Sequence, residues 1–124
     1  MNDTHNQLPQ ILIAEDNASN YLLFEFLLKQ NYQLLHAING REAIELFTLH
    51  QPQLIIMDIK MPEVDGFEAT QAIRELSTTV PIIAVTAYAF QQDQERILNS
   101  GFNAYISKPI NSTELKKTIE QLLN

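Results

Sequence analysis

Short apolar runs alternate along the chain with longer segments in which apolar residues recur every three or four positions. The runs typical of buried strands are residues 10–14, 34–38, 54–58, 82–86 and 104–106. Runs of this length and composition indicate strands covered on both faces, as in a parallel sheet. Helical periodicity is found at about 20–30, from Asn39 to Gln51, from the loop at 61–66 to Leu76, at about 90–99 and from Asn111 onward. This fivefold alternation predicts one α/β domain with right-handed crossovers and helices on both faces of the sheet.

Capping signals mark where several of these helices begin and end. Asn39 is followed three residues later by Glu42, and Asn111 by Glu114, a spacing that resembles a capping box. Gly101 supplies an end signal for the fourth helix, because glycine accepts the left-handed backbone found there. The residues expected to face the core are Leu23, Phe24, Leu27 and Leu28 in the first helix, Ala43, Ile44 and Phe47 in the second, and Leu115, Ile119 and Leu122 in the last.

Composition narrows the class of protein. The 124 residues correspond to about one domain, and 45% of them are hydrophobic, an ordinary globular value. We expect residues 1–9 to form a disordered lead and residues 10–124 to form the domain. The chain has no cysteine, which excludes disulfides, thiolate catalysis and cysteine-based zinc sites. The formal net charge of −7 opposes binding to a phosphate backbone, so nucleic acid is not an expected partner.

Targeting signals are absent from the pattern as well. No apolar stretch approaches the ~20 residues needed to span a bilayer, so no membrane insertion is expected. Residues 1–7 are polar and lack the charged and apolar regions of a signal peptide. We therefore expect a cytoplasmic domain. The histidines His5, His36 and His50 follow no ligand pattern and are predicted to be surface or core residues.

Polar residues follow four of the predicted strands at the point where each strand ends. Glu15 and Asp16 come after the first strand, Asp58 ends the third, Thr86 ends the fourth, and Lys108 follows the fifth. The carboxyl ends of parallel strands meet at one edge of a sheet, where α/β sheets bind their ligands. We therefore expect these side chains to converge and to form a site for a hard cation and a phosphoryl group.

Three carboxylates in one cleft would repel one another unless a cation joined them. Mg²⁺ takes oxygen ligands in octahedral geometry and keeps several waters, so Glu15, Asp16 and Asp58 fit it. The backbone carbonyl of Lys60, two residues past Asp58, is placed to add a further ligand. With Lys108 included, these side chains carry a net charge of −2, which one Mg²⁺ would neutralise. An alternative role for Glu15 and Asp16, taken alone, is to cap the helix that follows them.

Asp58 is the expected nucleophile of this site. Its carboxylate would attack phosphorus in line and form an acyl phosphate, while the metal and Lys108 stabilise the transferring oxygens. Lys108 can pair with Asp58 at rest and with a phosphoryl oxygen afterwards. Thr86 can donate a hydroxyl hydrogen bond to the same oxygens, and its alternative role is that of a strand-favouring β-branched residue.

Four short motifs, in their order and spacing, resemble those of response-regulator receiver domains over residues 10–123. They are Ile13-Ala14-Glu15-Asp16-Asn17, Met57-Asp58-Ile59-Lys60-Met61-Pro62 with Asp65-Gly66, Val85-Thr86-Ala87, and Ser107-Lys108-Pro109-Ile110. The resemblance implies a flavodoxin-like three-layer fold with a five-stranded parallel sheet in the order 2-1-3-4-5. The second and fourth motifs look most like receivers of hybrid sensor histidine kinases. The chain is thus expected to be either a single-domain regulator or a receiver from a larger, membrane-attached hybrid kinase.

The resemblance also implies roles for the site residues. Asp58 would be the phosphoacceptor, taking a phosphoryl group from a phosphohistidine of a sensor histidine kinase or a histidine phosphotransfer domain. Thr86 and Lys108 would hold the phosphoryl group. The ligands implied for Mg²⁺, or for Mn²⁺ in its place, are Glu15, Asp16, Asp58 and the backbone carbonyl of Lys60.

A conformational switch is implied by the same resemblance. Thr86 and Tyr105 would form it, biasing a two-state surface around the fourth helix, the fifth strand and the fifth helix. Such a domain phosphorylates and dephosphorylates itself but turns over no external substrate. We expect a monomer or a weak phosphorylation-dependent dimer.

Other classes of function remain open alternatives. A magnesium-dependent phosphatase or phosphotransferase that works through an aspartyl phosphate usually has a second acid two residues after the nucleophile, where this chain has Lys60. A receiver-like docking module that takes no phosphate, or a flavin-binding relative of the fold, is a third class. The presence of every expected site residue argues against the docking module, and absorbance of the purified protein would detect a flavin.

Overall fold

The computed structural model describes residues 8–87 and 91–124; the predicted helix start at residue 90 and residues 1–7 of the predicted lead lie outside this description. The strands are β1 (Gln10–Ala14), β2 (Gln33–Ala37), β3 (Leu54–Asp58), β4 (Ile82–Thr86) and β5 (Ala104–Ser107). The helices are α1 (Ala18–Leu28), α2 (Gly40–His50), α3 (Gly66–Leu76), α4 (Gln91–Asn99) and α5 (Ser112–Leu123). All strand pairs are parallel, in the order β2-β1-β3-β4-β5. The predicted α/β fold and strand order are confirmed.

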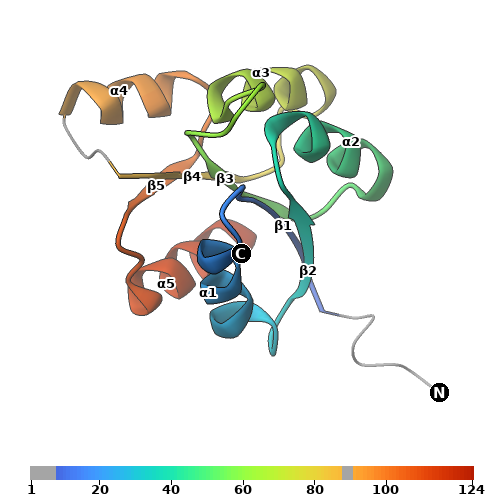
Figure 1. Cartoon of the computed structure of the whole chain (residues 1–124), viewed down its shortest axis with the longest axis vertical. Helices are drawn as coiled ribbons and strands as arrows, with labels where there is room; N and C mark the ends of the chain where they lie inside the picture. Colours follow the sequence, from blue (N-terminus) through green and yellow to red (C-terminus); the bar gives the residue numbers. More distant parts are fainter. Residues whose placement is uncertain (1–7, 88–90) are drawn as a thin grey trace.

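Helices cover both faces of the sheet, so the molecule has three layers (Figure 1). α1 and α5 lie on one face, and α2, α3 and α4 lie on the other. A separate cluster of buried apolar side chains fills the space between the sheet and each helical layer. β3 and β4 are buried along their whole length, which explains why they contain almost no polar residue. No helix in the described ranges is long and apolar enough to cross a bilayer.

The second strand begins and ends one residue earlier than the predicted 34–38. Ile38 is half exposed, and its backbone N–H donates to Glu42 Oε1 at 3.2 Å. The cap of α2 therefore uses the N–H that would have extended the strand. Asn39 accepts a hydrogen bond from the Glu42 N–H at 2.8 Å, as the capping signal predicted.

The first helix begins two residues earlier than the predicted 20–30. Asn17 caps it, because its side-chain oxygen accepts a hydrogen bond from the Asn20 N–H at 2.9 Å. Asparagine is among the residues preferred at this position, since its side chain satisfies an N–H that has no partner within the helix. This cap matters for function because it fixes the chain directly after two of the candidate site residues.

The core-facing stripe of α1 is narrower than predicted. Phe24 and Leu28 are buried and Leu27 is partly buried, but Leu23 is 42% exposed, so its prediction as a core residue is wrong. At 100° per residue, a stripe centred on Phe24 and Leu28 leaves position 23 at its rim.

The remaining helix signals agree with the structure. Gly101 has φ of 98° directly after α4, in the left-handed region that its end signal predicted. Asn111 accepts from the Glu114 N–H at 3.0 Å, and Leu115 and Ile119 of α5 are buried. The last strand extends one residue beyond the prediction, to Ser107.

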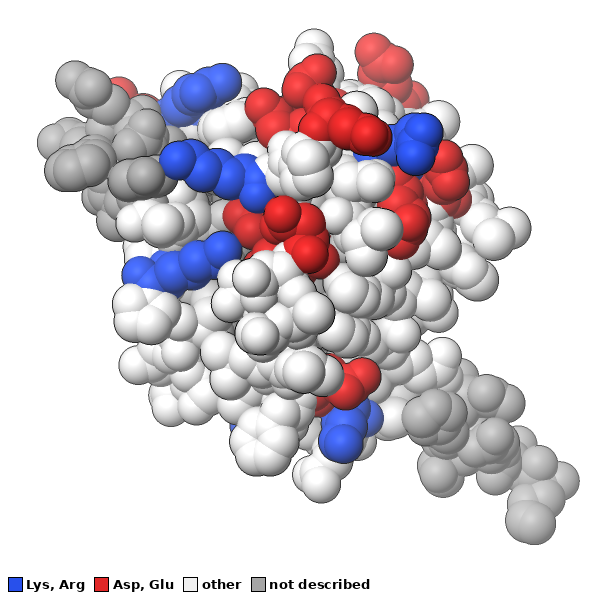
Figure 2. All heavy atoms as spheres, in the orientation of Figure 1, with Lys and Arg blue, Asp and Glu red and all other residues white. Residues whose placement is uncertain are grey.

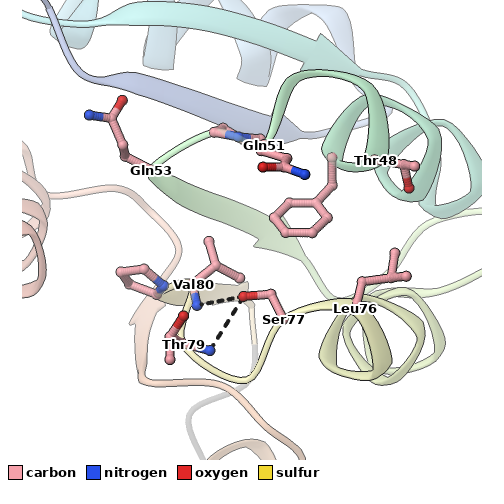
Figure 3. Close-up of a pocket in the computed structure, with 10 residues that line it drawn as sticks. Thr48, Gln51, Gln53, Leu76, Ser77, Thr79 and Val80 are labelled. Atoms are coloured by element: carbon pink, nitrogen blue, oxygen red, sulfur yellow. Dashed lines mark hydrogen bonds between the residues drawn. The ribbon is translucent and has the colours of Figure 1, made fainter.

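A cavity of about 520 Å³ lies at the edge of the sheet where the strands begin (Figure 3). Its floor is apolar, with Phe47 and Val80, and its rim carries amides and hydroxyls such as those of Gln51 and Ser77. Among the described residues that line it, none is charged. The candidate site residues lie at the opposite edge of the sheet, where the strands end.

Candidate functional site

The fold brings residues from three strand ends together. Asp58 is the last residue of β3, Glu15 follows β1, and β1 and β3 are neighbours in the sheet. Lys108 follows β5, and its backbone N–H donates to the Thr86 carbonyl at 2.8 Å. Glu15, Asp58 and Lys108 each lie two residues after an isoleucine buried against the α1 and α5 layer. Because side chains alternate between the faces of a strand, the three project from the sheet on the same side.

Three carboxylates converge at this edge. One oxygen from each of Glu15, Asp16 and Asp58 lies within 4.8 Å of the others. Glu15 is 1% exposed and Asp58 is 4% exposed, whereas Asp16 lies at the surface. Figure 2 shows acidic side chains grouped near the middle of the displayed face, with basic side chains beside them. Two of the charges are therefore removed from water, and one remains accessible.

Lys108 is the cation that compensates the buried pair. Its Nζ lies 3.2 Å from Asp58 Oδ2 and 3.7 Å from Glu15 Oε1. The peptide bond that follows it, Lys108–Pro109, is cis. On the other side of the site, the Lys60 backbone N–H donates to Asp58 Oδ1 at 3.2 Å, so this backbone segment lies against the carboxylate. Each oxygen of Asp58 thus accepts a hydrogen bond, and these two bonds fix the orientation of its carboxylate.

Glu15 is the acid of the site whose pKa departs most from its ordinary value. Burial, the largest cause, together with the neighbouring Asp58 carboxylate raises the pKa of Glu15 from its ordinary 4.5 to about 7. A hydrogen bond from the Asn17 N–H, at 3.1 Å from Glu15 Oε2, and the Lys108 ammonium act in the opposite direction. One ammonium is therefore too little positive charge for two buried carboxylates.

The donor set fits a divalent cation. Glu15 Oε1 is buried and has no hydrogen-bond partner among the described residues, so an acceptor oxygen is left over in the cluster. Hard cations such as Mg²⁺ prefer carboxylate oxygens and keep waters on their exposed side. A cation placed here would meet the buried carboxylates of Glu15 and Asp58 and the exposed carboxylate of Asp16.

We expect the stability of the metal-free protein to depend on the proton of Glu15. The folded state holds this proton up to about pH 7 and the unfolded state releases it near pH 4.5. Because the folded pKa is the higher one, the stabilisation is complete below pH 4.5 and is lost as the pH rises through 7. Since each tenfold change in proton affinity is worth 1.36 kcal/mol, the loss amounts to roughly 3 kcal/mol once the pH is well above 7.

Denaturant unfolding in the presence of a chelator, at several pH values, measures this effect. Glu15→Gln mimics the protonated acid and serves as the reference, because the groups outside the acidic cluster titrate alike in both proteins. The unfolding free energy of the wild type should fall relative to that of Glu15→Gln between pH 4.5 and 7. A difference that stays constant over this range would show that Glu15 ionises normally.

Thr86 and Tyr105 lie on neighbouring strands close to the acidic cluster. Thr86 ends β4, is 7% exposed and follows Val85, the partner of Asp58 in the sheet register. Tyr105 of β5 pairs with Ala84 and packs against the core cluster on the α2, α3 and α4 side. Residues 84 and 86 lie on the same face of β4, so Thr86 and Tyr105 both face the helical layer that contains α4.

Sequence reasoning missed two contacts of the loop after β1. Asn17 both caps α1 and donates its N–H to Glu15 Oε2. Its position directly before a helical segment was the signal that could have identified the cap. His36, predicted only as a surface or core residue, places its ring Nε2 2.8 Å from the Glu15 carbonyl oxygen. No local signal predicts that contact, because the two residues lie 21 positions apart.

Comparison with known proteins identifies the class to which this fold and site belong. The family model of the response regulator receiver domain matches residues 11–120. The chain therefore belongs to the response-regulator receiver domain family. Among individual relatives, the polar-differentiation response regulators DivK of Brucella anthropi and Brucella ovis are each 42% identical to it over 116 residues, covering 91% of this chain and 94% of theirs.

Solved structures agree in fold. The receiver domain of the sensor histidine kinase PA1611 from Pseudomonas aeruginosa, with a magnesium ion coordinated in its active site cleft, matches with a TM-score of 0.87 and 34% identity, covering 94% of this chain and 98% of that one. The chemotaxis protein CheY4 of Vibrio cholerae matches with a TM-score of 0.88 and 27% identity, covering 94% and 99%. The predicted resemblance to receiver domains is confirmed.

Membership of this family defines the class of function. Receiver domains are phosphoacceptors of two-component signalling, and the family implies histidine kinases or phosphotransfer proteins as partners. They are signalling domains and not enzymes that turn over a substrate, which excludes the phosphatase alternative. The predicted association with a hybrid kinase has partial support, because one structural neighbour is a receiver of a sensor histidine kinase.

Proposed function

We propose that Asp58 is the residue of this receiver domain that accepts the phosphoryl group, within a domain that spans residues 10–124. One observation carries the proposal: Asp58 is held between Lys108 Nζ at 3.2 Å and the carboxylates of Glu15 and Asp16, at the edge of the sheet where the strands end. Both of its oxygens accept a hydrogen bond, one from Lys108 Nζ and one from the Lys60 N–H, whereas Glu15 Oε1 meets Lys108 only as an ion pair at 3.7 Å. The Asp58 carboxylate is thus held in one orientation.

Glu15, Asp16, Asp58 and the Lys60 backbone carbonyl would hold Mg²⁺, or Mn²⁺ in its place. When bound, the cation supplies the two positive charges that the acidic cluster lacks and draws negative charge from the transferring oxygens. Glu15 Oε1 has no hydrogen-bond partner among the described residues, and the pKa of Glu15 is raised. Both observations support a role for Glu15 and Asp58 as metal ligands. Binding would displace the proton of Glu15.

The proposed reaction is a transfer from nitrogen to oxygen. A carboxylate oxygen of Asp58 attacks the phosphorus of a phosphohistidine, the P–O bond forms, and the P–N bond breaks. The leaving imidazole keeps the bonding electron pair and takes a proton from solvent or from the donor protein. Lys108 and Thr86 would then contact phosphoryl oxygens, so Lys108 exchanges its bond with Asp58 for one with the phosphoryl group.

The same site would set the signalling state. Thr86 would move toward the phosphoryl group, and Tyr105, which faces the same helical layer, would follow it inward. These movements would bias the surface formed by α4, β5 and α5 between two states. Thr86 and Tyr105 lie on the same face of the neighbouring strands β4 and β5, offset by two positions in the register, and this placement supports the coupling.

The surface beside the site supports a protein as the phosphodonor. Leu22, Leu23 and Phe26 of α1 are 59%, 42% and 76% exposed, and they lie within five consecutive positions of one helix, so they form an apolar patch. Leu23 also lines a cavity of about 140 Å³ together with Lys108 and Pro109. This apolar face would dock a sensor histidine kinase or a histidine phosphotransfer domain.

We place the domain in the cytoplasm, either alone or within a hybrid kinase, as a monomer or a weak phosphorylation-dependent dimer.

Incubation with Mg²⁺ and phosphoramidate, followed by intact mass measurement, tests the proposed function. A small donor removes the need to know the partner, because the proposal assigns the transfer chemistry to the receiver itself. The wild type should gain the mass of one phosphoryl group. No gain in mass would contradict the proposal, and so would a gain that is unaffected by excess chelator.

Lys60 should slow the loss of the phosphoryl group. After transfer, the site would carry a small net negative charge even with Mg²⁺ bound, and the exposed Lys60 side chain could offset it. We expect the acyl phosphate of Lys60→Ala to decay about two- to fivefold faster, in the range of a surface charge interaction. Decay is followed by intact mass after removal of the donor, with the exposed Lys117→Ala on α5 as a control. Equal decay rates in wild type and Lys60→Ala would refute this role.

A further inference from the structure

The segment that carries two of the proposed metal ligands is held by residues outside the acidic cluster. Glu15 and Asp16 follow the end of β1, where regular pairing with the neighbouring strands stops. Asp16 is exposed, so its carboxylate is not positioned by packing. Its location depends on the orientation of the peptide unit between Glu15 and Asp16, since this unit sets the direction in which the Asp16 side chain leaves the backbone.

His36 fixes that peptide unit from β2. Its ring Nε2 lies 2.8 Å from the carbonyl oxygen of Glu15. A carbonyl oxygen can only accept, so Nε2 carries the proton and the ring donates. On the other side of the same residue, the Glu15 N–H donates to the Ala37 carbonyl at 2.9 Å. β2 therefore continues to hold the chain one residue beyond the end of β1, by a backbone bond and then by a side chain.

The His36 ring is itself held in place from α1. Tyr21 stacks on it with ring centroids 3.6 Å apart and planes inclined by 8°. Tyr21 lies in the first turn of α1, and its backbone N–H donates to the Asn17 carbonyl at 3.0 Å. The N–H of Asn17 in turn donates to Glu15 Oε2. Both the ring and the helix cap thus converge on residues 15–17.

We propose that His36, clamped by Tyr21, is a positioning residue that orients the Glu15–Asp16 peptide and thereby places the Asp16 carboxylate for the cation. The inference rests on the proposed function, because it concerns the affinity of that same site for Mg²⁺. Groups that orient metal ligands from outside the coordination sphere commonly contribute 10–100-fold to affinity. His36 acts through one peptide unit, so we expect an effect at the lower end, about five- to tenfold.

Magnesium titration calorimetry at constant pH tests the role of the hydrogen bond. His36→Leu introduces an apolar side chain of similar size that has no donor, and should raise the dissociation constant for Mg²⁺ about five- to tenfold. His36→Gln restores an N–H donor and should return it to within about twofold of the wild type. Tyr21→Ala, which leaves the donor but frees the ring, should also weaken binding.

Leu34→Ala is the matched control, because residues 34 and 36 lie on the same face of β2 and Leu34 packs in the core without reaching Glu15. It should lower thermal stability and leave the dissociation constant unchanged.

Unchanged affinity in His36→Leu, or equal weakening in His36→Leu and His36→Gln, would overturn the inference. If His36→Leu does not fold, normal affinity in Tyr21→Ala would overturn it. A wild type that binds no Mg²⁺ would instead contradict the proposed function.

Discussion

Asp58→Asn should abolish phosphorylation completely while the domain remains folded. The amide is nearly isosteric with the carboxylate but is a poor nucleophile, so no acyl phosphate can form at position 58. The substitution also removes one negative charge from a cluster in which Glu15 Oε1 has no hydrogen-bond partner among the described residues. We therefore expect thermal stability of the metal-free protein to be unchanged or higher. Intact mass after incubation with Mg²⁺ and phosphoramidate should show no gain.

A neighbouring acid provides the control for this result. Glu63 lies in the loop between β3 and α3, at the surface and outside the acidic cluster. Glu63→Gln makes the same chemical change as Asp58→Asn and should be phosphorylated like the wild type. Full phosphorylation of Asp58→Asn would mean that another group is the acceptor.

Gly66→Ala should lower the stability of the fold strongly and should also disturb the site. A Cβ at this position would lie 2.5 Å from the Asp58 carbonyl oxygen and 2.8 Å from the Ile59 Cα, both of them backbone atoms. The Gly66 N–H donates to the Ile59 carbonyl at 2.9 Å, so α3 begins in direct contact with the end of β3. Because a backbone contact cannot be relieved by a side-chain rotation, we expect a destabilisation of about 2–3 kcal/mol.

The displaced backbone carries Asp58, so Gly66→Ala should also slow phosphorylation in the fraction that remains folded. Denaturant unfolding gives the first quantity and the initial rate of mass gain gives the second. Ser112→Ala is the control, because Ser112 is likewise the first residue of a helix, α5, and should change neither by much. A Gly66→Ala protein as stable and as reactive as the wild type would show that α3 does not press on the strand end.

The convergence of the site could be predicted from the sequence because it depends only on topology. Asp58 and Glu15 each follow a run of buried apolar residues, and parallel strands bring all such positions to one edge. Lys108 was identified in the same way, from a third strand. Helix caps at Asn39 and Asn111 were predictable because a cap depends on residues only three positions apart.

Contacts that depend on packing between distant segments were not predictable. The His36 bond to Glu15 requires the register of β1 with β2, and no pattern within either strand reveals it. The early end of β2 depends on competition between the sheet and the α2 cap for one N–H, that of Ile38. The prediction for Leu23 was wrong because the buried stripe of α1 is centred on Phe24 and Leu28 and leaves Leu23 at its rim.

Mass-spectrometric mapping of the phosphorylated residue shows whether Asp58 accepts the phosphoryl group. Wild-type protein is incubated with Mg²⁺ and phosphoramidate, reduced with borohydride to convert an acyl phosphate into a stable alcohol, and digested. We expect the reduced product at Asp58 alone, and no product when Mg²⁺ is withheld. A product at Glu15, Asp16 or any other residue, or equal labelling in the presence of a chelator, would contradict it.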